Sequence, residues 1–124
     1  MMINSEVFQI IYDELSQYLS EGWERLVVYL EYGEASYSFS FFEKVNDEYI
    51  KCFDIPDISE EALDSSFGNI YETTKPERDK LEDKWSNMTM VVESNGEMHT
   101  DFDYTDLSSG NYKYLKEWKK SYLV

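Results

Sequence analysis

The chain has 124 residues, the size of one ordinary domain, and 42% of them are hydrophobic, which is enough for a buried core. Its 26 acidic residues outnumber 11 basic ones and give a formal net charge of −15. A field of this sign repels nucleic acid and anionic lipid and attracts basic partners. We therefore expect no direct binding of DNA, RNA or a membrane.

The cysteine count and the hydropathy indicate the compartment. Cys52 is the single cysteine and cannot form an internal disulfide, which suits a reducing environment. The first residues show no basic segment followed by an apolar one, and no apolar run approaches the ~20 residues of a membrane span. We expect one cytoplasmic domain over residues 1–124.

The first expected element is a helix within residues 4–22. Val7, Ile11 and Leu15 recur at helical spacing, and Gly22 is a natural stop because glycine adopts the left-handed conformation without a Cβ clash.

Three strands are expected next, over residues 23–32, 36–44 and 48–53. The second alternates aromatic residues with serines, which is typical of a half-buried strand.

The middle segment predicts a second helix that is capped by Ser59, whose oxygen accepts from free first-turn amides. Pro76 lies further along this helix and lacks a backbone N–H. We expect Pro76 to break or kink the helix, or to begin another one as its first residue.

Residues 87–104 predict a β-hairpin whose loop length follows from the side-chain pattern. A two-residue Asn95-Gly96 loop mixes core and solvent on both faces of the hairpin, whereas a three-residue loop, Ser94 to Gly96, separates them. The three-residue loop implies a type I turn with Gly96 in the bulge position. It pairs Val92 with Met98, Met90 with Thr100 and Met88 with Phe102, and it places His99, Asp101 and Asp103 together on the polar face.

The last expected element is a helix over residues 111–124, with Asn111 as its cap and Leu115, Trp118 and Tyr122 on one face. This segment has a net charge of +3, whereas residues 1–110 have −18. Its lysines either form a solvated face or pair with acidic residues in the remainder of the chain. The element order α-β-β-β-α-β-β-α indicates an α+β fold, an antiparallel sheet with helices packed on one face.

Asp101, Asp103 and Asp106, with His99, form the most metal-like group in the chain. Carboxylate oxygens on one strand face suit a hard cation, but the spacing matches no calcium loop and the chain has too few His or Cys for a usual zinc site. The competing interpretation is a solvated acidic face that contacts a partner.

Catalysis has less support. Cys52 and His99 are 47 positions apart, and the chain has no phosphate-binding glycine loop and no nucleophile elbow. A small metal-dependent hydrolase that uses the three aspartates remains the alternative, and an acidic adaptor or nucleic-acid mimic is a third. The tryptophans Trp23, Trp85 and Trp118 are either core residues or interface anchors.

Several features together resemble the YezG-type antitoxin, or immunity protein, family over about residues 5–122. They are Trp23 before the first strand, the aromatic second strand, Ile55-Pro56 before the middle helix, Trp85 before the hairpin, and Phe102-Asp103-Tyr104. The chain departs from the family at Pro76, because the family's middle helix is unbroken.

The resemblance implies a protein that binds the toxic C-terminal domain of a secreted polymorphic toxin, often a nuclease, and so protects the producing cell. No enzymatic activity, metal or cofactor is expected. A basic nuclease is electrostatically complementary to this acidic chain. The residues that we expect to contact it are His99, Asp101, Asp103 and Asp106, or else Glu60, Glu61 and Asp64 of the middle helix.

Overall fold

The computed structural model describes residues 5–34 and 36–124, and Ser5 by its backbone alone. Five antiparallel strands form one sheet, in the order β3-β2-β1-β4-β5. The elements are α1 (Ser5–Ser16), β1 (Arg25–Tyr32), β2 (Tyr37–Val45), β3 (Glu48–Lys51), the 3-10 helix η1 (Cys52–Asp54), α2 (Glu60–Asp79), β4 (Asn87–Glu93), β5 (Met98–Asp103) and α3 (Tyr112–Tyr122). The α+β class and the element order are confirmed.

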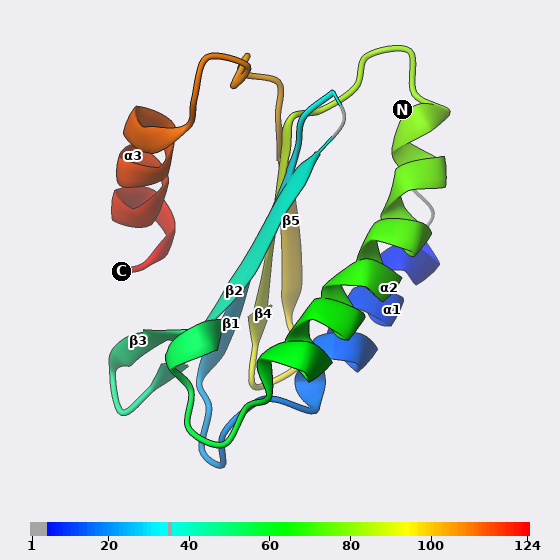
Figure 1. The fold of residues 1–124 in the computed structure, drawn as a ribbon. Helices are drawn as coiled ribbons and strands as arrows, with labels where there is room; N and C mark the ends of the chain where they lie inside the picture. Colours follow the sequence, from blue (N-terminus) through cyan, green and yellow to red (C-terminus); the bar gives the residue numbers. More distant parts are fainter. Residues whose placement is uncertain (1–4, 35) are drawn as a thin grey trace.

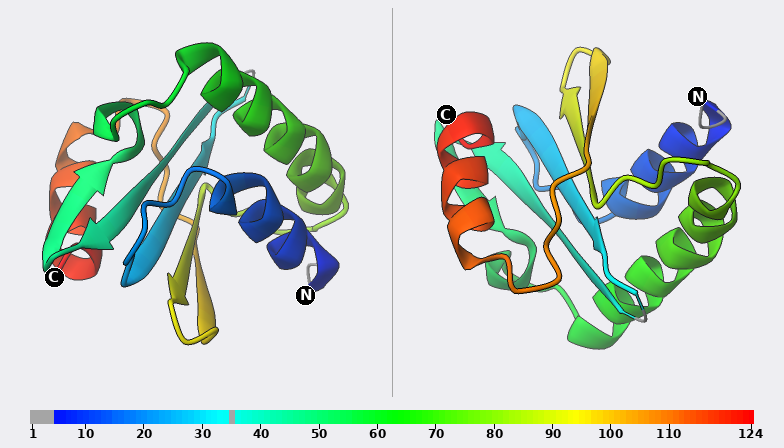
Figure 2. Two further views of the ribbon diagram at one scale, coloured as in Figure 1. Left: turned by 90° about the horizontal axis from the view of Figure 1, so that it is seen from below. Right: turned by 90° about the horizontal axis from the view of Figure 1, so that it is seen from above.

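The helices cover both faces of the sheet. Helices α1 and α2 lie side by side on one face, and α3 lies on the other (Figures 1 and 2). The expectation of helices on one face is therefore wrong. The physical reason is in the central strand β1, where every residue from Leu26 to Leu30 is buried, so both faces need a cover.

The larger core lies between the sheet and the α1–α2 layer. Leu15 of α1, Ile70 of α2 and the alternate strand residues Val28 and Phe41 are all fully buried there. The residues between them, Val27 and Tyr29 of β1 and Phe42 of β2, point the other way and form a second core with Trp118 of α3. The consecutive pair Phe41-Phe42 is buried on both faces, which breaks the simple alternation expected for β2.

Two helix boundaries differ from expectation. Helix α1 ends at Ser16, and Gly22 has its positive φ of 80° in the loop that follows. Helix α2 begins after Ser59, whose side chain accepts from Ala62 N at 3.3 Å, which confirms the cap. It then continues through Pro76 to Asp79.

Helix α2 passes Pro76 because the end of the helix is held by tertiary contacts. The proline removes one backbone bond near the C-terminus of the helix, and its own side chain is exposed. Two residues further on, Arg78 donates from Nε to the carbonyl of Trp85 at 2.7 Å. Its guanidinium also lies over the ring of Tyr32, 4.8 Å from the centroid. The expected break or second helix is therefore wrong, and α2 is unbroken, as the resemblance implies.

The β4–β5 register is as expected. The pairs are Val92 with Met98, Met90 with Thr100 and Met88 with Phe102. Gly96 has a φ of 98°, and its N–H donates to the carbonyl of Glu93 at 2.9 Å, as a type I turn with a glycine bulge requires. The third expected strand is shorter than expected, because β3 ends at Lys51 and Cys52 enters η1 with its side chain in the larger core.

Candidate functional site

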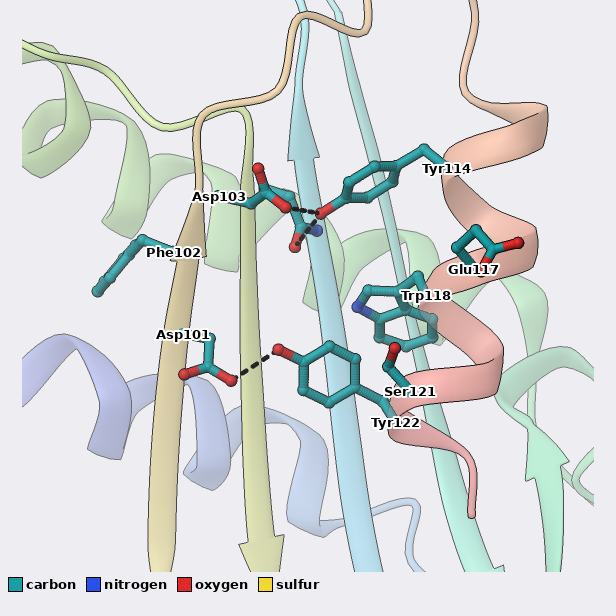
Figure 3. Close-up of a pocket in the computed structure, with 9 residues that line it drawn as sticks. Asp101, Phe102, Asp103, Tyr114, Glu117, Trp118, Ser121 and Tyr122 are labelled. Atoms are coloured by element: carbon teal, nitrogen blue, oxygen red, sulfur yellow. Dashed lines mark hydrogen bonds between the residues drawn. The ribbon is translucent and has the colours of Figure 1, made fainter.

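A cleft of about 290 Å³ lies between the last strand, β5, and helix α3 (Figure 3). Register places the side chains of His99, Asp101 and Asp103 on the face of the sheet that α3 covers. Tyr114, Trp118 and Tyr122 are spaced by four residues and project from α3 toward the same cleft.

The two aspartates of the cleft are hydrogen-bonded to α3 by tyrosines. Tyr122 donates from its hydroxyl to Oδ2 of Asp101 at 2.6 Å, and Tyr114 donates to Oδ2 of Asp103 at 2.9 Å (Figure 3). Asp103 also accepts from the backbone N–H of Thr105 at 2.9 Å and from its hydroxyl at 2.7 Å. Asp103 is half-buried, and the side chain of Asp101 is 43% exposed. They do not form the freely solvated face that the strand pattern suggests.

The protonation states in the cleft follow from this geometry. The hydrogen bonds from Thr105, opposed by partial burial and helped by Tyr114, hold the pKa of Asp103 below its ordinary value of 3.8. Burial, together with the bond to Asp101, raises the pKa of Tyr122 to about 12. Burial and the bond to Asp103 raise the pKa of Tyr114 as well. Near neutral pH the tyrosines are therefore protonated donors, and Asp103 is an ionised acceptor.

No lysine or arginine neutralises these carboxylates within the described part of the chain. Asp101 contacts the exposed His99 instead, with Nε2 and Oδ1 2.8 Å apart, and this contact is an ion pair only when the imidazole is protonated. The lysines of α3 are all exposed, and Lys120 pairs with Glu117 of the same helix at 3.7 Å. The basic helix therefore contacts these two aspartates through tyrosine hydroxyls, and none of its lysines neutralises their charge.

The base of the cleft and the start of α3 are fixed by buried polar groups. Asn87, 2% exposed, donates from Nδ2 to the carbonyl of Leu30 at 3.2 Å and accepts from Tyr114 at 3.2 Å. Trp118 donates from Nε1 to the hydroxyl of Thr89 at 2.8 Å. Asn111 occupies the cap position, but its side chain donates to Oε1 of Glu31 at 2.8 Å rather than to the helix. The expectation that the Asn111 side chain caps this helix is therefore wrong.

The remaining expected site residues do not join this cleft. Asp106 lies in the exposed loop after β5, where its Oδ1 accepts from Ser108 N at 2.9 Å. Glu60, Glu61 and Asp64 are exposed on the first turns of α2, in the layer that covers the opposite face of the sheet. The structure therefore separates the expected contact residues into two groups on opposite faces.

The geometry gives little support to the alternative function, a metal-dependent hydrolase. Among the described residues, no group of three or more His, Cys, Asp or Glu side chains is placed to hold a metal ion. Cys52 is fully buried in the larger core, where burial raises the pKa of its thiol, whereas His99 is exposed on the other face. A cysteine–histidine pair is therefore not formed between these two residues.

Sequence reasoning missed the tyrosines that orient the acidic side chains. The signal was present, because aromatic residues at 114, 118 and 122 recur every four positions and so share one helix face.

The three tryptophans lie in different environments. Trp85 and Trp118 are 0% and 4% exposed and belong to the two cores, whereas Trp23 is half-buried and lines a groove beside Tyr12 and Met98.

Among residues 5–34 and 36–124, none of the helices combines the length and the hydropathy that a membrane span requires. Residues 4–123 match the model of the family described as "Immunity protein YezG-like". The chain is similar to "Immunity protein YezG" of Bacillus subtilis (strain 168), with 23% identity over 126 residues that cover 92% of this chain and 83% of the relative. Because the family model matches nearly the whole chain, this protein belongs to the YezG-like immunity proteins.

Proposed function

We propose that this protein binds a basic toxin domain, a nuclease, and neutralises it as a stoichiometric inhibitor without turnover. The family supplies the immunity role. The observation that carries the finer proposal is the β5–α3 cleft, where the carboxylates of Asp101 and Asp103 are oriented by tyrosines and have no lysine or arginine counterion among the described residues.

The choice of a nuclease rests on electrostatic complementarity. Nucleases hold phosphates on basic surfaces, and a chain with a net charge of −15 is attracted to such surfaces at long range. Complementary charge raises the association rate, and the gain decreases with salt because mobile ions screen it. Rapid capture suits an inhibitor that protects the cell in which the toxin is made.

Two surfaces compete for the contact in this proposal. One comprises His99, Asp101, Asp103 and Asp106 around the cleft, and the other comprises Glu60, Glu61 and Asp64 on α2. Glu60 and Glu61 lie in the first turn of α2, where negative charge interacts favourably with the helix dipole, so these two residues have a structural role that needs no partner. We place the toxin at the cleft for this reason.

The test is co-expression with the protein encoded by the neighbouring gene, followed by co-purification and titration of its nuclease activity. We expect a 1:1 complex and full inhibition at one equivalent. The proposal is contradicted if no complex forms. It is also contradicted if far less than one equivalent of this protein inhibits the nuclease fully, because that would indicate turnover.

Matched charge variants locate the surface. Asp101→Asn with Asp103→Asn keeps the side-chain size and an oxygen acceptor for each tyrosine but removes both charges. We expect this pair to slow association at low salt. The control is Glu60→Gln with Glu61→Gln, which removes the same charge from the opposite face and is expected to bind as wild type does. Slower association of the control alone moves the contact to α2.

A further inference from the structure

Strand β5 is an edge strand, and its free edge has a defined pattern of unpaired backbone groups. Glu93 and Glu97 form a hydrogen-bonded pair, with Glu93 N donating to Glu97 O at 2.8 Å. Bonded and non-bonded pairs alternate along an antiparallel ladder, so His99 and Asp101 bond to β4. The N–H and C=O groups of Met98, Thr100 and Phe102 therefore point away from the sheet, and nothing among the described strands pairs with them.

The two edges of the sheet differ in how they are protected. Strand β3 is four residues long and runs directly into a 3-10 helix, which leaves little edge for pairing. Strand β5 has six residues and contains no lysine, proline or bulge of the kinds that usually block an edge. The β5 edge is therefore the better template for an added strand.

The two faces beside this edge differ in chemistry. On the α1–α2 side, Met98 is 39% exposed and Phe102 is half-buried against Trp85, with ring centroids 5.7 Å apart. On the α3 side lie the acidic cleft and the carboxylates of Asp101 and Asp103. A strand added here places its alternate side chains over an apolar surface and over an anionic one.

A second copy of this chain is a poor occupant. It would align two strands that each carry Asp101 and Asp103, in chains that each have a net charge of −15, and like charges on neighbouring strands are destabilising. A basic strand has the opposite effect, because lysine or arginine side chains would lie above the uncompensated carboxylates.

We propose that the toxin domain adds a β-strand to the free edge of β5, and that this strand alternates basic residues facing the α3 cleft with apolar residues facing Met98 and Phe102. This inference rests on the proposed function and specifies how the partner is held. The main-chain bonds supply the register, and the alternating side chains supply the specificity.

The primary test is amide hydrogen exchange of the wild-type protein, measured by NMR with and without the toxin domain that co-purifies from the neighbouring gene. In the free protein we expect the amides of Thr100 and Phe102 to exchange fast and that of Asp101 to exchange slowly. In the complex we expect Thr100 and Phe102 to become protected, while the smaller change at Asp101 reveals the alternation.

Substitutions provide the second readout. Thr100→Pro removes one outward N–H, a change that an edge strand tolerates. The complex would lose one main-chain hydrogen bond to the added strand, so we expect the Kd for the toxin domain to rise by about tenfold or more. Thr100→Val keeps the N–H and the β-branched shape and is expected to leave the Kd unchanged. Lys51→Pro makes the same kind of change in β3, where φ is already −70°, and should also bind normally.

The outcomes distinguish a failure of strand addition from a failure of the proposed toxin-binding function. If no complex forms with wild type, the proposed function fails and the inference fails with it. If wild type binds but Thr100 and Phe102 exchange as fast as in the free protein, the function stands and strand addition is wrong. If these amides are already protected in a concentration-dependent dimer of the free protein, the edge belongs to a second copy and the inference is overturned.

Discussion

The two faces of the sheet are covered in different ways. The α1–α2 face is closed by two helices over a continuous aliphatic and aromatic core. The α3 face is closed by one helix, whose Trp118 packs on three buried residues of the sheet, and tyrosine hydroxyls at its periphery donate to aspartates. The first face supplies most of the buried apolar area, and the second combines a small core with a charged cleft.

The difference predicts that the two faces respond differently to cavities. Phe41→Ala on the α1–α2 face removes a fully buried ring, and we expect it to cost about 3–5 kcal/mol of the free energy of unfolding and to lower the melting temperature of the whole domain. Phe53→Ala is the control, because Phe53 is 47% exposed. Similar melting temperatures for the two variants would show that the larger core is misplaced.

Trp118→Ala on the α3 face should cost less of the global stability, about 3 kcal/mol at most, because α3 can detach while the larger core remains. Hydrogen exchange shows whether α3 detaches alone or unfolds together with the rest of the domain. We expect faster exchange in α3 and unchanged exchange in the central strand β1. Equal acceleration in both elements would mean that the faces unfold as one unit.

Gly96→Val changes an element that both faces share, the β4–β5 turn. A β-branched side chain at a φ of 98° costs about 1–2 kcal/mol, and no neighbouring atom lies near the added Cβ, so the cost is backbone strain alone. The variant should lower the denaturation midpoint with α3 and β1 affected together. Gly68→Val lies within helix α2, where nothing crowds an added Cβ and φ is not positive, and it controls for the size of the new side chain.

Tyr114→Phe tests the polar attachment of α3. The hydroxyl bonds Asp103 at 2.9 Å and Asn87 at 3.2 Å, and its removal should cost about 1 kcal/mol. Tyr112→Phe is the matched control two positions away, because Tyr112 is 82% exposed. Chemical denaturation measures both variants, and equal midpoints would show that the tyrosine–carboxylate bonds contribute nothing to docking.

Acid should produce the smallest effect. The folded-state pKa of Asp103 lies below 3.8, so its contribution to stability is present above the unfolded pKa and is lost as the pH falls through the folded value. We expect the attachment of α3 to weaken below about pH 4, when Asp103 takes up a proton. Asp103→Asn should reduce this part of the pH dependence, and an unchanged acid profile would remove Asp103 from the account.

The sequence by itself determined the features that depend on local chemistry. The alternation of residues 87–104 predicted both the hairpin register and the glycine bulge, because a slip by one residue would have turned every side chain over. Ser59 predicted its cap, and helical spacing predicted three helices in the correct order. In each case, the residues that decide the structure are close together in the chain.

Only the tertiary structure decided which groups meet across the sheet. Pro76 should have interrupted α2, but Arg78 binds the carbonyl of Trp85 and holds the helix beyond the proline. Asp101 and Asp103 should have faced solvent, but α3 crosses to that face and supplies Tyr122 and Tyr114 as donors. Spacing along one strand cannot reveal what a distant helix will place above it, because that depends on how both faces of the sheet are buried.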